Sequence, residues 1–388
     1  MTTIAVLKET AENEKRVALV PESVKRLAKR DISVLIQEGA GEHVGFTSQM
    51  YKKTGGEVLS DYDELLQRGK LFLKVQCVCL KEGMMQIVDP FPKKSVIIGF
   101  FDPFKNIHNV EELADKQMTC FSMELIPRIS RAQRMDPLSA MSSIAGYKAV
   151  LMAANHLNKF FPLMMTAAGT VSPAKVLIIG AGVAGLQAIA TAKRLGAKVK
   201  VFDTRPVVKE QVESLGADFV HLEVAEETEM EGGYGVEMSE DFYRHEQVTI
   251  AEHIAKTDVA ITTAQIFGKR APLLITEEMV RKMPYGSVIV DLAAEQGGNC
   301  ELTVKGQTVS RHGVFIIGPT DLPSSISYHA SEMFSRNVTG LVLEIIKDGQ
   351  INIDMEDEVI ENTILTHEGK IINKHVKDLL NWEKESDS

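Results

Sequence analysis

The chain has 388 residues, which is enough for two to three domains that each bury a sizeable core. A hydrophobic share of 44%, a charged share of 25% and a net charge of −10 are typical of a globular protein, and they argue against nucleic acid or an anionic membrane surface as a partner. The four cysteines form no CxxC pair and the N-terminus lacks an apolar signal segment, so we expect buried thiols, no metal site and a cytoplasmic location.

The first third of the chain alternates predicted strands and helices. Pro21–Lys29 predicts a helix, because proline suits the first helical position. Continuous apolar runs are typical of strands buried in a parallel sheet. Such runs lie at Ile4–Leu7, Ile32–Gln37, Leu71–Val75 and Val96–Phe100.

The pattern breaks at Pro127–Pro137, where PRISRAQRMDP is polar and follows neither a helical nor a strand period. One interpretation is a domain-junction loop in which Arg128 and Asp136 pair and hold a nicotinamide carboxamide, while Gln133 reaches another group. The other is a solvated linker, and composition alone does not separate the two. A helix is predicted next, at Ser139–Leu157.

Residues 175–205, KVLIIGAGVAGLQAIATAKRLGAKVKVFDTR, read as strand, glycine turn, amphipathic helix and second strand. Gly180 allows the tight turn, Gly182 lets a pyrophosphate approach the backbone, and Gly185 lets helix and strand pack closely. The phosphates would bind N–H groups at the positive end of the helix. This segment predicts a dinucleotide-binding domain.

Asp203 ends the second strand of this motif, where a carboxylate can take both ribose hydroxyls of an adenosine. The same carboxylate would repel a 2′-phosphate, which favours NAD over NADP. The nearby Arg205 complicates this prediction, because an arginine here is how NADP enzymes accept that phosphate. Asp203 is given more weight, since it occupies the strand end itself.

Two apolar segments around the motif are assigned to the interior. Val176–Ala192 has no charge but is too short for a membrane span. Met164 and Met165 are expected in the core, as methionines usually are.

The remaining chain completes one domain and returns to the other. Further strands are predicted at Val176–Ile179, Val199–Phe202, Phe219–Val220, Val259–Thr262, Val288–Asp291 and Val314–Ile317. A helix at Ser331–Asp348 and short strands at Ile351–Ile353 and Thr363–Thr366 are too few to stand alone, and the final NWEKESDS is expected to fray.

The predicted fold is therefore α/β, with two doubly wound Rossmann-like domains built on parallel sheets. The N-terminal domain would be discontinuous, comprising residues 1–138 and 325–388. Residues 139–324 would form the NAD(H)-binding domain.

Two further features bear on chemistry. Residues 226–247 are acidic and carry Gly232, Gly233, Tyr234 and Gly235, which fits either a mobile lid with one covering ring or an exposed acidic loop. Histidine is absent between His108 and His156 and again from there to His221, so neither the junction loop nor the glycine motif offers the usual acid or base. Hydride transfer between two nicotinamides would need none.

The segments PRISRAQRMD, TAAGTVSPAKVLIIGAGVAGLQAIATAKRLGA, DTRPVVKEQVESLGADF, AITTAQIFGKRAPLLITEEMV and DLAAEQGGNCE together resemble the NAD(H)-binding alpha subunit of proton-translocating NAD(P) transhydrogenase. The resemblance implies a dimeric subunit peripheral to the cytoplasmic face of the inner membrane. Its NADH would pass hydride to NADP on a partner domain, and proton movement would run through a membrane-spanning component, both on separate chains.

The resemblance also implies site residues. It assigns catalytic roles to Arg128, Gln133, Asp136 and Ser139. It assigns cofactor contacts to Arg128, Ile129, Gln133, Asp136, Gly180, Ala181, Gly182, Val183, Gly185, Asp203, Thr204, Arg205, Gly233, Tyr234, Gln247 and Gln265.

Two alternatives remain. Alanine dehydrogenase resembles the chain, and its substrate arginine and lysine match Arg16 and Lys74. Its catalytic histidine has no counterpart in Val96–Asp102, however, and Glu295 stands where its catalytic aspartate is expected. A non-catalytic NAD-binding regulatory module would bind nucleotide without transferring hydride.

Overall fold

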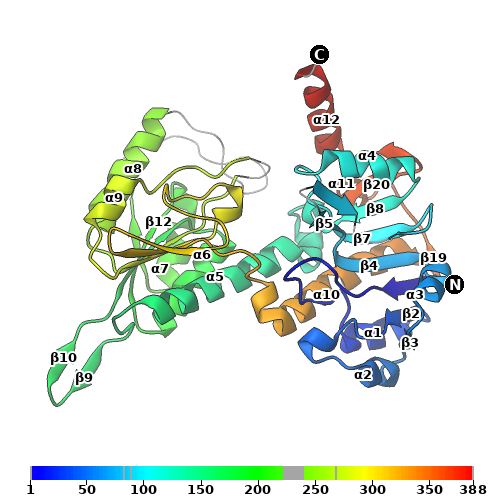
Figure 1. The fold of residues 1–388 in the computed structure, drawn as a ribbon, viewed down its shortest axis with the longest axis horizontal. Coiled ribbons are helices and arrows are strands. Elements are labelled where there is room, and N and C mark those ends of the chain that lie inside the picture. The colour runs from blue at the N-terminus through cyan, green and yellow to red at the C-terminus, as the bar shows by residue number, and fades with distance from the viewer. Residues whose placement is uncertain (1, 82–83, 88–89, 222–239, 267–268, 387–388) are drawn as a thin grey trace. The chain divides into compact units, whose positions relative to one another are not determined.

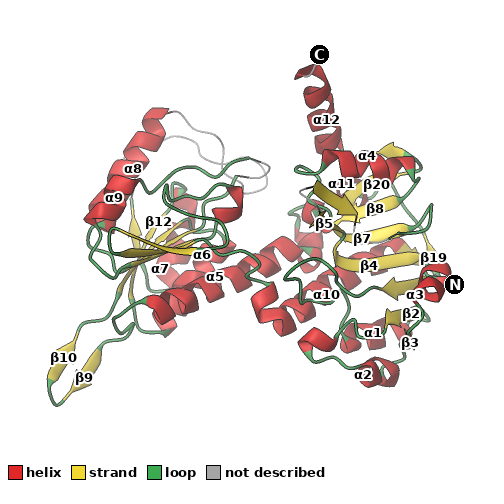
Figure 2. Cartoon of the chain, in the orientation of Figure 1, coloured by secondary structure: helices red, strands yellow, loops and turns green. Residues whose placement is uncertain are grey.

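The computed structural model describes residues 2–81, 84–87, 90–221, 240–266 and 269–386. The chain divides into two compact units, Met1–Met141 with Pro323–Ser388 (unit 1) and Ser142–Leu322 (unit 2). Each unit is a sheet covered by helices, as Figure 2 shows, so the α/β prediction is confirmed.

Unit 1 is built on an eight-stranded sheet of order β21-β20-β8-β7-β4-β1-β2-β3. The strands are β1 (Thr3–Val6), β2 (Ser33–Gln37), β3 (Glu57–Leu59), β4 (Leu71–Gln76), β7 (Val96–Phe100), β8 (Thr119–Ser122), β20 (Ile364–His367) and β21 (Lys370–Ile371). Strands β1 to β8 of this sheet run parallel, whereas β20 joins β8 antiparallel. The C-terminal tail thus completes the N-terminal sheet, as predicted.

The helices of unit 1 are α1 (Pro21–Ala28), α2 (Ser48–Lys53), α3 (Tyr62–Arg68), α4 (Ile107–Asp115), α10 (Ser327–Ile345), α11 (Glu358–Thr363) and α12 (Lys374–Ser386). Helix α1 begins at Pro21, whose missing N–H costs nothing at a first helical position. The prediction that NWEKESDS frays is wrong for residues 381–386, because α12 continues to Ser386. Residues 387 and 388 lie outside the described residues. Two short hairpins, β5 (Val78–Lys81) with β6 (Met84–Ile87) and β18 (Ile346–Lys347) with β19 (Gln350–Ile351), were not predicted as hairpins.

Unit 2 is built on a seven-stranded sheet of order β13-β12-β11-β14-β15-β17-β16. The strands are β11 (Lys175–Ile179), β12 (Lys198–Phe202), β13 (Asp218–Val220), β14 (Val259–Thr262), β15 (Val288–Asp291), β16 (Thr308–Arg311) and β17 (Val314–Ile317). All pairings are parallel except that of β16 with β17. Counted from the edge strand β3 in unit 1 and from β13 in unit 2, each sheet places its own strands in the chain order third, second, first, fourth. This order confirms the doubly wound prediction.

The helices of unit 2 are α6 (Val183–Arg194), α7 (Lys209–Ser214), α8 (Glu240–Ile254) and α9 (Glu277–Lys282), with most of α5 (Pro137–His156). Strand side chains alternate between two cores. Val176 and Ile178 pack with residues of α5 and α6, whereas Leu177 and Ile179 pack with residues of α8 and α9. The near-continuous apolar run of β11 arises because helices cover both faces of its sheet.

A hairpin of β9 (Met164–Thr166) and β10 (Gly169–Val171) projects from unit 2 (Figure 1). Met164 and Met165 are 36% and 77% exposed, so the prediction that they belong to the core is wrong. A pair of apolar residues without helical or strand periodicity does not reveal whether a neighbouring element will cover it.

Candidate functional site

The turn between β11 and α6 is built on glycine geometry. Gly180 has φ +97°, and a Cβ there would lie 2.4 Å from the Thr263 hydroxyl. A Cβ on Gly185 would lie 1.9 Å from the carbonyl oxygen of Gly180, so this helix packs onto the turn only without a side chain. A Cβ on Gly182, in contrast, would meet nothing within 4 Å. The backbone at Gly182 is therefore open to a ligand.

Helix α6 begins at this turn with no side-chain cap, because its N-cap residue is Gly182. First-turn N–H groups lack partners inside a helix and lie at its positive end, so they suit phosphate oxygens. Ala181 is buried behind the turn and Val183 is exposed at the first helical position. The turn fits the pyrophosphate of a dinucleotide.

Asp203 follows β12 and ties its end to the glycine turn. Its Oδ2 accepts a 2.6 Å hydrogen bond from the N–H of Ala181, and Arg205 donates from its backbone N–H, Nε and one terminal nitrogen at 2.9–3.0 Å. Arg205 is therefore charge-paired with Asp203 in the same unit. Each carboxylate oxygen accepts two of these four hydrogen bonds, so a ribose hydroxyl bound to Asp203 would replace one of them. Thr204, between them, is half-buried.

Two predicted cofactor contacts, Gln247 and Gln265, also lie in unit 2. Gln247 donates from Nε2 to the carbonyl of Leu273, and Gln265 donates to the carbonyl of Leu292, each at 2.8 Å. Gln265 follows β14, the strand beside β11. Gly233 and Tyr234 lie outside the described residues, so the lid stays a prediction.

Sequence reasoning gave no role to Asp291, the last residue of β15, which is fully buried. Its carboxylate accepts five hydrogen bonds of 2.7–3.0 Å, from the hydroxyls of Thr262 and Thr303 and from the N–H groups of Ala293, Asn299 and Cys300. It thus fixes the loop that carries the Leu292 carbonyl. An acid at the end of an apolar strand, as at Asp203, was the available signal.

The RISRAQ loop is a fixed 3₁₀ helix, Ser130–Met135, in unit 1. Ala132 and Met135 are fully buried. Met135 packs against Gly340 of α10, where an added Cβ would lie 2.7 Å from the Met135 side chain. Arg131 forms a two-pronged ion pair with Asp357, with both N···O distances at 2.9 Å.

The next turn of this loop is anchored on α10. Arg134 pairs with Glu344, and the side-chain amide of Asn337 donates to the Arg134 carbonyl at 3.0 Å. With these anchors in place, the solvated-linker interpretation no longer fits.

The anchored loop leaves Arg128 and Gln133 exposed and Ile129 half-buried. Asp136 caps α5, because its oxygens accept from the backbone N–H and the hydroxyl of Ser139 at 3.0 and 2.5 Å. The structure therefore gathers the predicted catalytic group in unit 1 and the glycine-turn group in unit 2.

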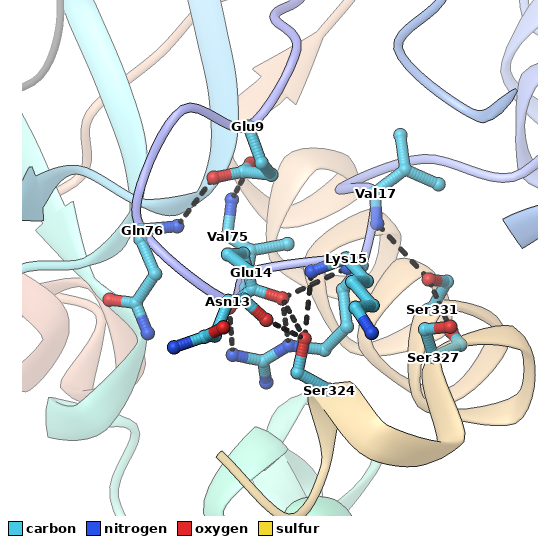
Figure 3. A network of polar contacts seen from close by, with 11 residues as sticks. Glu9, Asn13, Glu14, Lys15, Val17, Val75, Gln76, Ser324, Ser327 and Ser331 are labelled. Atoms are coloured by element: carbon cyan, nitrogen blue, oxygen red, sulfur yellow. Dashed lines mark hydrogen bonds and ion pairs between the residues drawn. The ribbon is translucent and has the colours of Figure 1, made fainter. Parts of the chain in front are cut away.

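Arg16 and Lys74 are buried side chains of unit 1. Figure 3 shows the polar network of the same unit around Glu9, Glu14 and Ser324. Arg16 donates from Nε and from a terminal nitrogen to the two carboxylate oxygens of Glu14, at 2.8 and 2.5 Å. Lys74 donates to the carbonyl of Lys8 at 3.1 Å. Glu9 accepts from the N–H groups of Val75 and Gln76 at 2.7 and 3.2 Å. Burial raises the pKa of Glu9 to about 7, against the opposing charge of Lys74.

Other polar positions also bear on the choice of chemistry. In the segment where alanine dehydrogenase would carry its histidine, Phe101 is 2% exposed and contributes no titratable group. Glu295 is exposed, 4.0 Å from Lys305. Across the described ranges, no group of three side chains is arranged to hold a metal, and no helix is long and apolar enough to cross a bilayer.

Two doubly wound sheets, one of them with an open glycine turn at an uncapped helix, define a dinucleotide-binding protein of the Rossmann type. Family descriptions match residues 5–145 as the N-terminal domain and 149–374 as the C-terminal domain of alanine dehydrogenase/PNT. The chain belongs to this alanine dehydrogenase/PNT family.

Within the family, the similarity is higher to transhydrogenase chains. The chain is 44% identical to an NAD(P) transhydrogenase alpha-subunit chain of Rhodospirillum rubrum, over 95% of this chain and 97% of that protein. It is 28% identical to alanine dehydrogenase of Bacillus subtilis, over 98% and 95%. The solved transhydrogenase of Sinorhizobium meliloti superposes with a TM-score of 0.85 at 39% identity, covering 95% of this chain and 100% of that one.

Proposed function

We propose that this chain is the NAD(H)-binding subunit of a proton-translocating NAD(P) transhydrogenase, which exchanges hydride between NADH on unit 2 and NADP on a partner chain. The observation that carries the proposal is that one chain contains both an open dinucleotide turn, in unit 2, and an anchored RISRAQ loop, in unit 1. The sequence contains a single GxGxxG motif, so the second nucleotide must come from elsewhere.

The bound nicotinamide would supply the hydride chemistry, and the chain would supply binding and orientation. Gly180, Gly182 and Gly185 would admit the pyrophosphate, and Asp203 would accept ribose hydroxyls. Ala181, Val183, Thr204, Arg205, Gln247 and Gln265 would line the rest of the unit 2 site, with Gly233 and Tyr234 closing over it.

The anchored loop would present Arg128, Ile129 and Gln133, with Asp136 and Ser139 fixing its C-terminal side. Gln133 is neutral and can both donate and accept, which suits a residue that touches two cofactors. No proton acceptor is required, because hydride passes between two rings held in contact.

The proposal extends to the assembly. The chain would form a homodimer at the cytoplasmic face of the inner membrane, beside separate chains that bind NADP and carry the membrane component. The relatives are named as alpha subunits, which supports the existence of partner chains.

Alanine dehydrogenase is the competing function, and among the residues of this chain it is favoured by Arg16 and Lys74. Both are engaged within unit 1, by Glu14 and by the Lys8 carbonyl. The segment Val96–Asp102 contains no histidine, although the catalytic histidine of that enzyme would be required there.

The deciding experiment mixes the purified chain with an NADP-binding transhydrogenase domain and follows reduction of an NADP analogue by NADH. A matched reaction gives the chain NADH, pyruvate and ammonia. We expect transfer only in the first mixture. Alanine formation in the second would identify a dehydrogenase, and NADH binding with neither reaction would identify a regulatory module.

A further inference from the structure

Thr263 is the first residue after β14, and it contacts the glycine turn of unit 2. Its hydroxyl donates to the carbonyl of Gly180 at 3.1 Å and to the carbonyl of Ile179 at 3.3 Å. Its backbone N–H donates to the same Ile179 carbonyl at 2.9 Å. The hydroxyl has one proton, which the two carbonyls share. The residue that follows one strand thus holds the carbonyl side of the turn that leaves the neighbouring strand.

The other side of the same turn is held from β12. The N–H of Gly180 donates to the carbonyl of Phe202 at 2.8 Å. The N–H of Ala181, the next residue of the turn, donates to Oδ2 of Asp203 at 2.6 Å. The peptide group between these two turn residues is therefore fixed at both ends, by Thr263 at its carbonyl and by Asp203 at its N–H.

This fixed peptide group lies directly before the open backbone of Gly182, where a Cβ would meet nothing within 4 Å. Because a peptide group is planar, its orientation limits the directions in which the next N–H groups of the turn can point. Donors stabilise an anion best when they are oriented before it arrives. Thr263 is thus placed to set the geometry of a phosphate-binding turn without touching the nucleotide.

The neighbouring threonine has a different environment. Thr262 is fully buried, and its hydroxyl donates to Asp291 at 2.9 Å inside the sheet core. Thr263 is only half-buried, and its hydroxyl faces the turn so closely that a Cβ on Gly180 would lie 2.4 Å from it. The first threonine therefore serves the core, whereas the second serves the turn.

We propose that Thr263 is a positioning residue of the unit 2 site, whose hydroxyl fixes the peptide group before Gly182 so that the turn can receive a pyrophosphate. The inference rests on the proposed binding of NAD(H) in unit 2. It gives a role to a residue that neither the glycine motif nor the acid at the end of β12 indicates.

The test measures NADH affinity by calorimetry for the full chain and for two variants, Thr263→Val and Thr263→Ser. Valine keeps the shape of threonine and lacks its hydroxyl, so the Gly180 carbonyl loses this donor. We expect NADH affinity to fall about fivefold, because the turn is no longer held in its binding orientation. Serine keeps the hydroxyl, and its affinity should stay within about twofold of the original.

A second measurement separates positioning from a purely structural role. Phosphorus-31 NMR signals of NADH, bound at saturation, report the surroundings of the pyrophosphate. They should move in Thr263→Val and keep their positions in Thr263→Ser. Thr257→Val is the matched control, because it removes a buried hydroxyl that donates to the His253 carbonyl at 2.9 Å, before the opposite end of β14. It should leave affinity and signals as they are.

Should Thr263→Val fold poorly, Thr263→Ala also removes the hydroxyl and should show the same two changes. Affinity or phosphorus signals that keep their original values in the valine and alanine variants would overturn the inference. Equal losses of affinity in the serine and valine variants would overturn it too. In these cases NADH binding by the unaltered chain would leave the proposed function standing. Failure of the unaltered chain to bind NADH at all would remove the proposed function itself, and the inference with it.

Discussion

The two units share a strand order but differ at the topological switch point, which is the place in each sheet where the strand order reverses. In unit 2 the hydroxyl of Thr263, which follows β14, donates to the carbonyls of Ile179 and Gly180 at the end of β11, and the open backbone of Gly182 comes next. In unit 1 the equivalent place, between β1 and β4, is closed by Glu9, whose carboxylate binds the N–H groups of Val75 and Gln76. The switch point of unit 2 thus carries a glycine turn with one open backbone position, whereas that of unit 1 carries a carboxylate that is bound to the neighbouring strand.

The connection after the first strand makes this difference. In unit 2, residues 180–182 alone separate β11 from α6, so the positive end of a helix meets the crevice directly. In unit 1, residues 7–20 separate β1 from α1, and this longer segment places the Glu9 carboxylate on the N–H groups of Val75 and Gln76 in β4. A doubly wound sheet offers a site at its switch point, but the connecting segment decides whether that site exists.

The largest effect is expected from removing the buried acid that organises unit 2. Asp291→Ala leaves two hydroxyls and three N–H groups without their acceptor. We expect a loss of about 3–5 kcal/mol in the free energy of unfolding, measured with urea. Asp218→Ala, on an exposed position of the same sheet, should change it by less than about 0.5 kcal/mol. Equal losses in the two variants would deny Asp291 its organising role.

Unit 1 should show a pH dependence that arises from its buried acids. Burial raises the pKa of Glu124 to about 7, even though it accepts from Ser122 and from the N–H groups of Phe101 and Asp102. The folded pKa exceeds the unfolded one, so this contribution to stability is complete below about pH 4.5 and is lost as pH rises through 7.

Glu124→Gln should flatten this profile. The free energy of unfolding is measured by chemical unfolding at each pH. Its difference between the variant and the unaltered chain should change by at most about 3 kcal/mol between pH 5 and 8. Glu22→Gln, on the exposed face of α1, serves as the control. A pH-independent difference for Glu124→Gln would show that the acid is ionised in the folded protein at all these pH values.

A smaller loss is expected from crowding the glycine turn of unit 2. Gly185→Ala places a Cβ 1.9 Å from the Gly180 carbonyl oxygen, so helix and turn must separate. Unfolding free energy should fall by about 1–3 kcal/mol, as in other overpacked interiors. Gly182→Ala, with open space around the new methyl group, should fold nearly as well. The opposite ranking of these two variants would contradict the described turn.

The smallest effect on stability is expected at the RISRAQ loop, where function should respond more. Arg131→Met breaks the partly exposed pair with Asp357 and should cost less than about 1 kcal/mol. Hydride transfer should slow about tenfold, because Gln133 loses its fixed support. NADH affinity should hold, as it should for the control Arg30→Met on the surface of unit 1. A variant that transfers hydride at the full rate would show that this anchor is dispensable.

Local patterns carried most of the fold prediction. The glycine turn and the apolar strands around it could be located from sequence, because each depends on neighbours within a few residues. Glu9 could not be assigned, since its partner Val75 is distant in sequence and no sequence pattern indicates that the two residues meet. Met165 was misassigned for the same reason, because hydrophobicity alone does not show whether another element covers a short hairpin.

The measurement that tests the central claim most directly is the number of NADH molecules bound per chain, determined by calorimetric titration of three proteins. The unaltered chain and Glu9→Gln in unit 1 should each bind one. Gly182→Val should fold but bind none, because its side chain occupies the open space beside the turn. Two bound molecules per chain, or one retained in Gly182→Val, would contradict the assignment of the nucleotide to the switch point of unit 2.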